Sequence, residues 1–440
     1  MRKHITLHYF LALLFSVLAS VAMAQNPLSL SKAVEKGLRN NFELQINRIE
    51  TQMASNQLKA AKKERLPQIN TSASQDNNFI NDRSPTSFVN GFYKDRNFSL
   101  GIDGSWVIFD GFQGKINRER YGKLKEISEG KEQLAIENSI YTILLAYYNV
   151  LLQKEAVGVA RKSLALSIER YEDAQVQENL GKISAYEVIR LENASLIDSS
   201  NIVNQRKELD AAIISLNQVM GNSKIVAYNL SDPLKYTAQQ YDFKSMKSRL
   251  ETSNQSLRNR YSNLEVLRLN TETAKKASLP SLSLNTGLSQ RFNGTAFPEI
   301  PRIKSNTFQY YLRFSANYNL FDGGARKRSV QENELLEQIE YLQIDQIKNN
   351  ITDNLASAIS NYNRQLELVQ VNESLIDNME KSLVIEKDRY TNGFSSALNF
   401  RTVQLEYVNA QFTRLQTIYD LLKNEIEILK ITGALTKAAF

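Results

Sequence analysis

The residues from Gly114 to Leu180 restrict the fold more than any other part of the chain. They follow a helical pattern without a proline, and their glycines, Gly122, Gly130 and Gly158, are isolated. At 1.5 Å per residue, such a helix is roughly 100 Å long. Helices of globular domains are far shorter, so this length predicts a coiled coil or a helical tube.

A second helical stretch of similar length follows the same short motif as the first. The motif Phe109-Asp110-Gly111 precedes the first stretch, and Phe321-Asp322-Gly323 precedes the second, 212 residues later (321 − 109). An aspartate can cap the first turn of a helix, and a glycine allows a sharp bend. The two motifs are therefore predicted to be structural corners between a strand and a helix, without a catalytic role.

Other landmarks recur at a spacing of 212 (393 − 181) or 213 (280 − 67) residues, which indicates an internal duplication. Leu66-Pro67 returns as Leu279-Pro280, and Gly181 returns as Gly393. We predict a first repeat at 25–221, an equatorial linker at 222–240 and a second repeat at 241–440. Each repeat reads as helix, strand, strand, long helix, glycine turn and helix, with hairpin loops at about 76–96 and 290–306.

Alternation of apolar and polar residues predicts the strands. Before the second corner, one parity is apolar and the other is mostly polar. The apolar parity contains Phe308, Tyr310, Leu312, Phe314, Ala316, Tyr318 and Leu320. Before the first corner the apolar parity contains Phe98, Leu100, Ile102, Trp106 and Ile108. Such two-faced strands are typical of a sheet with one face in an apolar medium.

The first 24 residues are expected to be an export signal. Arg2 and Lys3 precede an apolar run, and Ala22-Met23-Ala24 fits a cleavage site. The alternative is an N-terminal membrane anchor. Beyond this segment no run of about 20 apolar residues exists, so no membrane helix is predicted. Entry into a membrane would then depend on the strands.

The composition argues against an enzyme. The chain has no cysteine, and its two histidines, His4 and His8, lie in the predicted signal. This removes the residues of Ser-His-Asp and Cys-His catalysis and the usual zinc ligands. We therefore expect no catalytic residue, metal or cofactor. The formal net charge of +7 is spread along helices beside acidic residues, which favours solvated helix faces over nucleic-acid binding.

Four strands per chain imply an oligomer, because an open sheet edge cannot face lipid. Two chains would supply eight strands and three would supply twelve. A dimer of such long helices leaves little room for a lumen. The sequence therefore favours three chains.

The order and spacing of these motifs resemble the TolC family of outer-membrane efflux proteins. The resemblance covers the duplicated unit, the Leu-Pro before a strand, the two corners and the turn 389–400 (Arg-Tyr-Thr-Asn-Gly-Phe-Ser-Ser-Ala-Leu-Asn-Phe). It implies a mainly α fold with a small membrane β-barrel. In that fold a homotrimer builds an α-helical tube continuous with a 12-stranded barrel, which lies in the outer membrane and extends into the periplasm.

The resemblance also implies a function and partners. The protein is expected to be a passive exit duct of a tripartite efflux or type I secretion system. Its expected partners are a periplasmic adaptor (a membrane fusion protein), an inner-membrane transporter and outer-membrane lipid. The alternative is a periplasmic coiled-coil adaptor or scaffold, which does not account for four strands with one apolar face.

The resemblance further implies roles for the two helix tips. The residues expected to contact the adaptor are Gly181, Lys182, Ile183, Ser184, Gly393, Phe394, Ser395 and Ser396. The alternative is a plain turn between two helices. A periplasmic aperture is expected from Glu187, Asn399, Arg190 and Tyr390. Glu187 matches an acidic position of the family, whereas Asn399 departs from it. Arg190 and Arg401 are expected to be solvated rather than to close the tips as ion pairs.

Overall fold

The computed structural model describes residues 27–84, 86, 91–297 and 301–437. The predicted export signal lies outside these residues. The chain forms two compact units, one of which contains residues 48–131 and 258–346 and the other the rest of the chain. Each unit takes segments from both predicted repeats, so the repeats do not coincide with the compact units. The repeat boundaries themselves stay a prediction.

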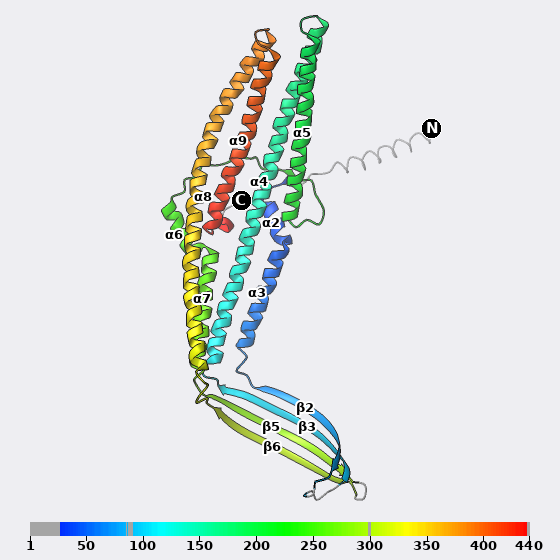
Figure 1. Cartoon of the computed structure of the whole chain (residues 1–440), viewed down its shortest axis with the longest axis vertical. Helices are drawn as coiled ribbons and strands as arrows, with labels where there is room; N and C mark the ends of the chain where they lie inside the picture. The colour runs from blue at the N-terminus through cyan, green and yellow to red at the C-terminus, as the bar shows by residue number, and fades with distance from the viewer. Residues whose placement is uncertain (1–26, 85, 87–90, 298–300, 438–440) are drawn as a thin grey trace, which may run out of the picture. The chain divides into compact units, whose positions relative to one another are not determined.

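The first unit contains an antiparallel four-stranded sheet in the order β2-β3-β5-β6. Figure 1 shows the four strands side by side and curving together. Their bounds are Gln68–Asp82 for β2, Gly91–Phe109 for β3, Ser281–Ala296 for β5 and Ile303–Asn317 for β6. Among the described strands, β2 and β6 each pair on one side only and form the two edges.

One face of this sheet is apolar, as the alternation predicted. Phe98 pairs with Phe292 across β3 and β5, and the two rings are stacked with centroids 6.2 Å apart. Leu288 and Tyr310 pair across β5 and β6, and the Tyr310 side chain is 81% exposed. We call this side the apolar face. Large side chains that are exposed along all four strands need a partner outside the single chain.

The strands are longer than predicted, and the hairpin loops are shorter. The expected loops at 76–96 and 290–306 are replaced by strand up to Asp82 and Ala296, and β3 begins at Gly91. Polar residues fill these extensions, which made them resemble loops. Their register nevertheless continues without a break, for example between Asn77 and Arg96, because a strand needs only continued backbone pairing.

The long helices match between the two halves of the chain. α4 (Gln113–Asn179) and α8 (Ala325–Thr391) have 67 residues each, and α5 (Ala185–Val219) and α9 (Ala397–Ile431) have 35 each. None of the helices in the described part of the chain has an apolar stretch sufficient to cross a bilayer. The equal lengths are what a duplication would produce.

The shorter helices differ from the sequence prediction. Each repeat is predicted to begin with one helix, which the helical pattern places at about 30–66 and about 243–279, but in the structure each of these is split in two. The segments are α2 (Leu30–Asn40), α3 (Phe42–Ala61), α6 (Phe243–Ser253) and α7 (Gln255–Lys276). Asn41 and Asn254 stand at the breaks, and each side-chain oxygen accepts a hydrogen bond from the backbone three residues later, at 2.9 and 3.0 Å. An asparagine cap competes with helix continuation, which the apolar pattern alone could not reveal.

The same breaks receive the ends of the returning helices. Asn40 donates to the Met220 carbonyl at the end of α5, and Asn254 donates to the Ile431 carbonyl at the end of α9. Gly433 has φ +63°, and a Cβ there would lie 2.6 Å from the Ser253 carbonyl oxygen. These contacts bring the end of α5 to the break between α2 and α3, and the end of α9 to the break between α6 and α7.

The predicted linker contains a short strand and a buried polar contact. β4 (Asn229–Leu230) pairs in parallel with β1 (Pro27–Leu28). The hydroxyl of Tyr147 in α4 donates to Asp232 at 2.6 Å and lies 2.8 Å from the Leu28 carbonyl. Burial raises the pKa of the Tyr147 phenol, and the adjacent Asp232 carboxylate raises it further. The linker is therefore fixed to α4 by polar contacts within a hydrophobic core.

Both corners have the capping geometry expected from the sequence. The Asp110 carboxylate accepts a hydrogen bond from the Gly114 N–H at 2.6 Å. The Asp322 carboxylate accepts from the Gly324 and Arg326 N–H groups at 3.0 and 3.1 Å. Each carboxylate thus satisfies helix N–H groups that have no partner within the helix.

Replacing Asp110 with alanine should lower the free energy of unfolding by about 1 kcal/mol, because the cap on α4 is lost. Asp110→Asn keeps the acceptor and should have a smaller effect. The measurement is the urea midpoint of the purified protein in detergent. Equal midpoints for the wild type and Asp110→Ala would contradict a capping role.

Candidate docking tips and the ion pair behind them

The turns at Gly181 and Gly393 have the same backbone geometry. Gly181 has φ +69° and Gly393 has φ +78°, which is the left-handed region that favours glycine. After each glycine, the next N–H donates to a carbonyl five residues earlier: Lys182 to Gln177 at 2.9 Å and Phe394 to Arg389 at 2.8 Å. Each of these hydrogen bonds closes the end of a helix over a residue with a left-handed backbone, which favours glycine at each tip.

The following helices begin in the same way. Ser184 and Ser396 are the N-caps of α5 and α9, and their hydroxyls accept from the N–H groups of Glu187 and Asn399 at 3.4 and 3.2 Å. Every predicted tip residue thus lies in a tightly defined turn or beside it. Glu187 and Asn399 occupy equivalent positions in the two tips, as the spacing of the repeats indicated.

The tips expose apolar side chains. Phe394 is 76% exposed and Tyr186 is 68% exposed. Leu180, Ile189 and Leu398 are also exposed nearby on the same turns and first helical turns. A Cβ at Gly181 or Gly393 would meet nothing within 4 Å. The surface therefore offers both apolar area and free space, which a protein partner could use.

The predicted aperture residues Tyr390 and Arg190 contact other side chains near the tips, and the Glu187 charge acts on the Tyr390 phenol; their role in an aperture stays a prediction. Tyr390 packs against Phe400 with ring centroids 5.7 Å apart, and the Arg170 guanidinium lies over both rings. Burial raises the pKa of the Tyr390 phenol, although the nearby Arg170 charge opposes this. Arg190 lies over the Tyr186 ring of its own helix. The Tyr390 contact joins α4 to α8 and α9, so it holds two hairpins together.

A buried ion pair lies behind the tips. Both guanidinium nitrogens of Arg401 in α9 contact the carboxylate of Asp198 in α5, at 2.6 and 2.7 Å. The Asp198 side chain is 3% exposed and that of Arg401 is 15% exposed. The expectation of a solvated Arg401 is therefore wrong. The pair is bidentate, which is the strongest geometry for an arginine and a carboxylate.

Three further polar side chains complete the cluster around Asp198. The hydroxyls of Ser163 and Ser167 in α4 donate to its carboxylate at 3.1 and 2.5 Å. The Gln404 amide in α9 donates to Ser163 and Ser167. We call these five residues, Ser163, Ser167, Asp198, Arg401 and Gln404, the Asp198 cluster. It joins the α4–α5 hairpin to the start of α9.

The Asp198 carboxylate is held in its charged form. Burial opposes ionisation, but hydrogen bonds from Arg401 and Ser167 and the Arg401 charge outweigh it and lower the pKa of Asp198 below its ordinary value. At neutral pH the cluster therefore contains a complete ion pair.

Sequence reasoning missed this cluster because its members are far apart in the chain. Asp198 and Arg401 are separated by 203 positions and lie in different predicted repeats. The available signal was Asp198 among the apolar positions of a helix, with Ser163 and Ser167 four residues apart on another. A single sequence does not say which helices are neighbours. The described residues contain no group of His, Cys or carboxylates suited to a metal ion.

Comparison with known proteins supports the family suggested by the sequence. Residues 247–434 match the family model described as outer membrane efflux protein. A curated relative, outer membrane efflux protein BepC of Brucella suis biovar 1 (strain 1330), is 22% identical over 419 residues, which is 93% of this chain and 86% of the relative. The second half of the chain therefore carries an outer membrane efflux protein domain. Together with the relatives, this identifies a TolC-like efflux channel of the outer membrane that extends into the periplasm.

Solved structures agree with the outer membrane efflux protein fold. The CmeC outer membrane channel of Campylobacter jejuni is 18% identical, covers 92% of this chain and 85% of its own, and gives a TM-score of 0.70. The MtrE outer membrane channel of Neisseria gonorrhoeae, in its open state, is 16% identical, covers 92% and 89%, and gives a TM-score of 0.74. The helical tube and strand region predicted from the sequence are confirmed as this fold.

Proposed function

We propose that this outer membrane efflux protein is the passive exit duct of a tripartite efflux or type I secretion assembly. In this assembly an inner-membrane transporter supplies the energy, and a periplasmic adaptor contacts the tips around Gly181 and Gly393. The observation that carries the proposal is a sheet whose apolar face is exposed along all four strands. A periplasmic scaffold would have no use for such a face.

The chain acts as a homotrimer in this proposal. The unpaired edges of β2 and β6 in a four-stranded sheet support closure with further copies, since an unpaired edge is costly in lipid. Three chains would supply twelve strands and a duct wide enough for a lumen. The lumen side would be the polar face of the sheet, which contains Asn70, Ser99 and Gln309.

Membrane fractionation tests the proposal. The full chain should sediment with outer membranes and migrate as a detergent-resistant trimer before heating. A strain without the gene should lose export, and the cloned gene should restore it. A protein recovered only in the soluble periplasmic fraction would overturn the proposal and favour the scaffold.

The polar contacts of the tips support docking rather than catalysis. Lys182, Ile183, Ser395 and Ser396 belong to turns that are fixed by backbone hydrogen bonds and exposed to solvent or half-buried. A rigid and accessible turn suits recognition by a partner, because little conformational entropy is lost on binding.

A cation site at the aperture gives a separate prediction. Glu187→Gln should weaken block of the conducting channel by a trivalent cation by about fivefold, because one negative charge near the cation is removed. The measurement is single-channel conductance in a planar lipid bilayer with added hexamminecobalt. Glu192→Gln, an exposed carboxylate on the same helix, is the matched control. Block that is the same in the wild type and Glu187→Gln would exclude this role for Glu187.

A further inference from the structure

We propose that the apolar face of the sheet carries a binding site for the phosphate groups of an anionic lipid in the outer leaflet. The site is formed by Arg96, Arg302 and Lys304, which we call the basic cluster. The inference rests on the proposed placement of the sheet in the outer membrane.

The strand register places the basic cluster on the same face as the apolar side chains. Arg96 pairs with Gly294, and Gly294 pairs with Lys304, so these residues form one row across β3, β5 and β6. The next row contains Phe98 and Phe292. Residues paired across strands point to one face, and residues two apart along a strand share it.

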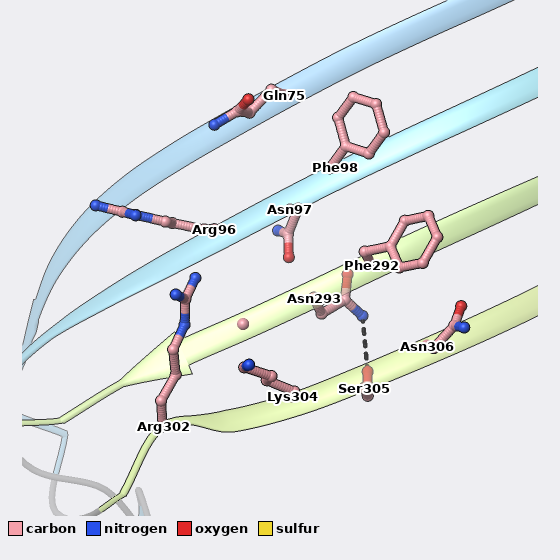
Figure 2. A pocket seen from close by; sticks show the side chains of 11 residues that line it. Gln75, Arg96, Asn97, Phe98, Phe292, Asn293, Arg302, Lys304, Ser305 and Asn306 are labelled. Carbon is pink, nitrogen blue, oxygen red and sulfur yellow. Dashed lines mark hydrogen bonds between the residues drawn. The ribbon is translucent and has the colours of Figure 1, made fainter.

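Arg302 completes the basic cluster by folding over Gly294. A Cβ at Gly294 would lie 2.8 Å from one Arg302 guanidinium nitrogen, so the glycine lets the Arg302 side chain lie directly against the strand. Figure 2 shows the Arg302 side chain extending from the end of β6 across β5, with Lys304 beside it and Arg96 on the neighbouring strand. The shallow pocket between them has a volume of about 470 Å³.

Both faces of the sheet carry basic residues, with Arg291 and Arg313 on the polar face, but the described strand carboxylates are confined to one face. The strand carboxylates Asp76, Asp82, Asp95 and Asp103 all have the parity of the polar face. Lys94, Arg96 and Lys304 have the parity of the apolar face. Within the described part of the chain, none of the ion pairs includes a member of the basic cluster. Clustered like charges repel one another, so this arrangement indicates an anionic partner.

The position along the strands matches a lipid headgroup. From Phe292 to Leu282 the apolar parity of β5 runs for ten residue steps, about 33 Å along the strand. At a tilt of about 40°, this corresponds to a height of about 25 Å, the usual apolar band of a membrane barrel. The basic cluster lies just beyond Phe98, at the end of the strands opposite the connections to the helices. That end faces the outer leaflet when the helices are periplasmic.

The chemistry of the basic cluster fits phosphate. Arginine donates two parallel hydrogen bonds to a phosphate, and lysine adds a compact charge. Acyl chains of the same lipid would contact the row of Phe98 and Phe292 below. A phosphorylated glycolipid with acyl chains, rather than a soluble anion, satisfies both parts of the site.

The test measures binding of lipid A to the purified full chain in non-ionic detergent by native mass spectrometry. The probes are bisphosphorylated lipid A and chemically dephosphorylated lipid A, with inorganic phosphate as a competitor. A basic residue near an anionic surface contributes roughly fivefold in affinity, so Arg96→Gln/Arg302→Gln/Lys304→Gln should bind bisphosphorylated lipid A on the order of 100-fold more weakly.

Control variants separate this site from general charge effects. Arg291→Gln/Arg313→Gln removes two charges from the polar face and should change binding by less than about twofold, because these side chains lie on the face opposite the proposed site. Arg96→Lys/Arg302→Lys keeps the charge and should retain most of the affinity. The wild type should bind dephosphorylated lipid A as weakly as the triple variant binds the bisphosphorylated form.

Three results would overturn the proposal. They are unchanged binding by the triple variant, equal binding of both lipids by the wild type, and full displacement by inorganic phosphate, which would indicate a free-anion site. Export measured in the same strains separates this inference from the exit-duct function. Export that continues without lipid binding refutes only the lipid site, whereas a chain absent from outer membranes refutes the duct.

Discussion

Asp198→Ala should lower the free energy of unfolding by about 3–5 kcal/mol, the largest stability effect expected from a single side chain here. The change leaves the Arg401 side chain, which is 15% exposed in the wild type, without its carboxylate, and it also removes the acceptor of Ser163 and Ser167. Urea unfolding in detergent, followed by circular dichroism, gives the midpoint. Hydrogen exchange should rise at the start of α9, which the Asp198 cluster joins to α4 and α5.

A double-mutant cycle isolates the ion pair. Asp198→Ala/Arg401→Ala should be less destabilising than the sum of the single variants, by about 2 kcal/mol or more. Glu208→Ala is the matched control, since Glu208 lies on the same helix in an exposed pair with Lys207 and should change stability by less than about 1 kcal/mol. Additive single variants would show that Asp198 and Arg401 do not interact energetically.

The ion pair also predicts a pH dependence. The folded pKa of Asp198 is below its ordinary value, so its stabilisation is complete above about pH 4 and is lost as the pH falls further. The difference in midpoint between the wild type and Asp198→Asn should therefore be constant from about pH 5 to 8 and shrink only in more acidic buffer.

Replacing Gly181 and Gly393 with tryptophan should reduce export to the level of a strain without the gene, while trimers still assemble. The left-handed backbone disfavours any side chain there by about 1 kcal/mol per site. Nothing in the described structure lies within 4 Å of the added Cβ, so the bulk would project into the docking surface instead of disturbing the fold. Tolerance of the native host to a panel of toxic dyes reports export.

Asparagine at both positions is the matched control. It accepts the left-handed conformation more readily than other non-glycine residues and adds little volume. Export should therefore be largely retained when Gly181→Asn and Gly393→Asn are combined in one chain. Full export with tryptophan at both tips would show that the tips do not dock to a partner.

Local patterns predicted most of the fold. The corners, the glycine turns and the long helices were all placed within a few residues, because a cap, a left-handed glycine and a 3.6-residue period act over short distances. The breaks at Asn41 and Asn254 were missed because an asparagine inside a helical pattern is compatible with a continuous helix and with a capped break. The polar strand ends, such as the one that contains Asn77, were predicted to be loops because their polar residues resemble those of a loop.

The site was less predictable because its parts depend on tertiary neighbours. The sequence identified Gly181 and Gly393 through their turn chemistry, but it could not show that Asp198 meets Arg401. Nor could it show that Tyr390, which stays a predicted aperture residue, packs on Phe400 beneath Arg170. Both outcomes follow from helix packing, which one sequence does not specify.

The equal 67-residue lengths of α4 and α8 have a consequence for how such a protein can change over time. One extra heptad in α4 alone would move its tip by about 10 Å along the helix axis and leave the other tip behind. The contacts of Arg170 with Tyr390 and of Asp198 with Arg401 would then be out of register. Insertions in the two long helices must therefore occur in matched pairs. The lengths of α4 and α8 can change during evolution only together.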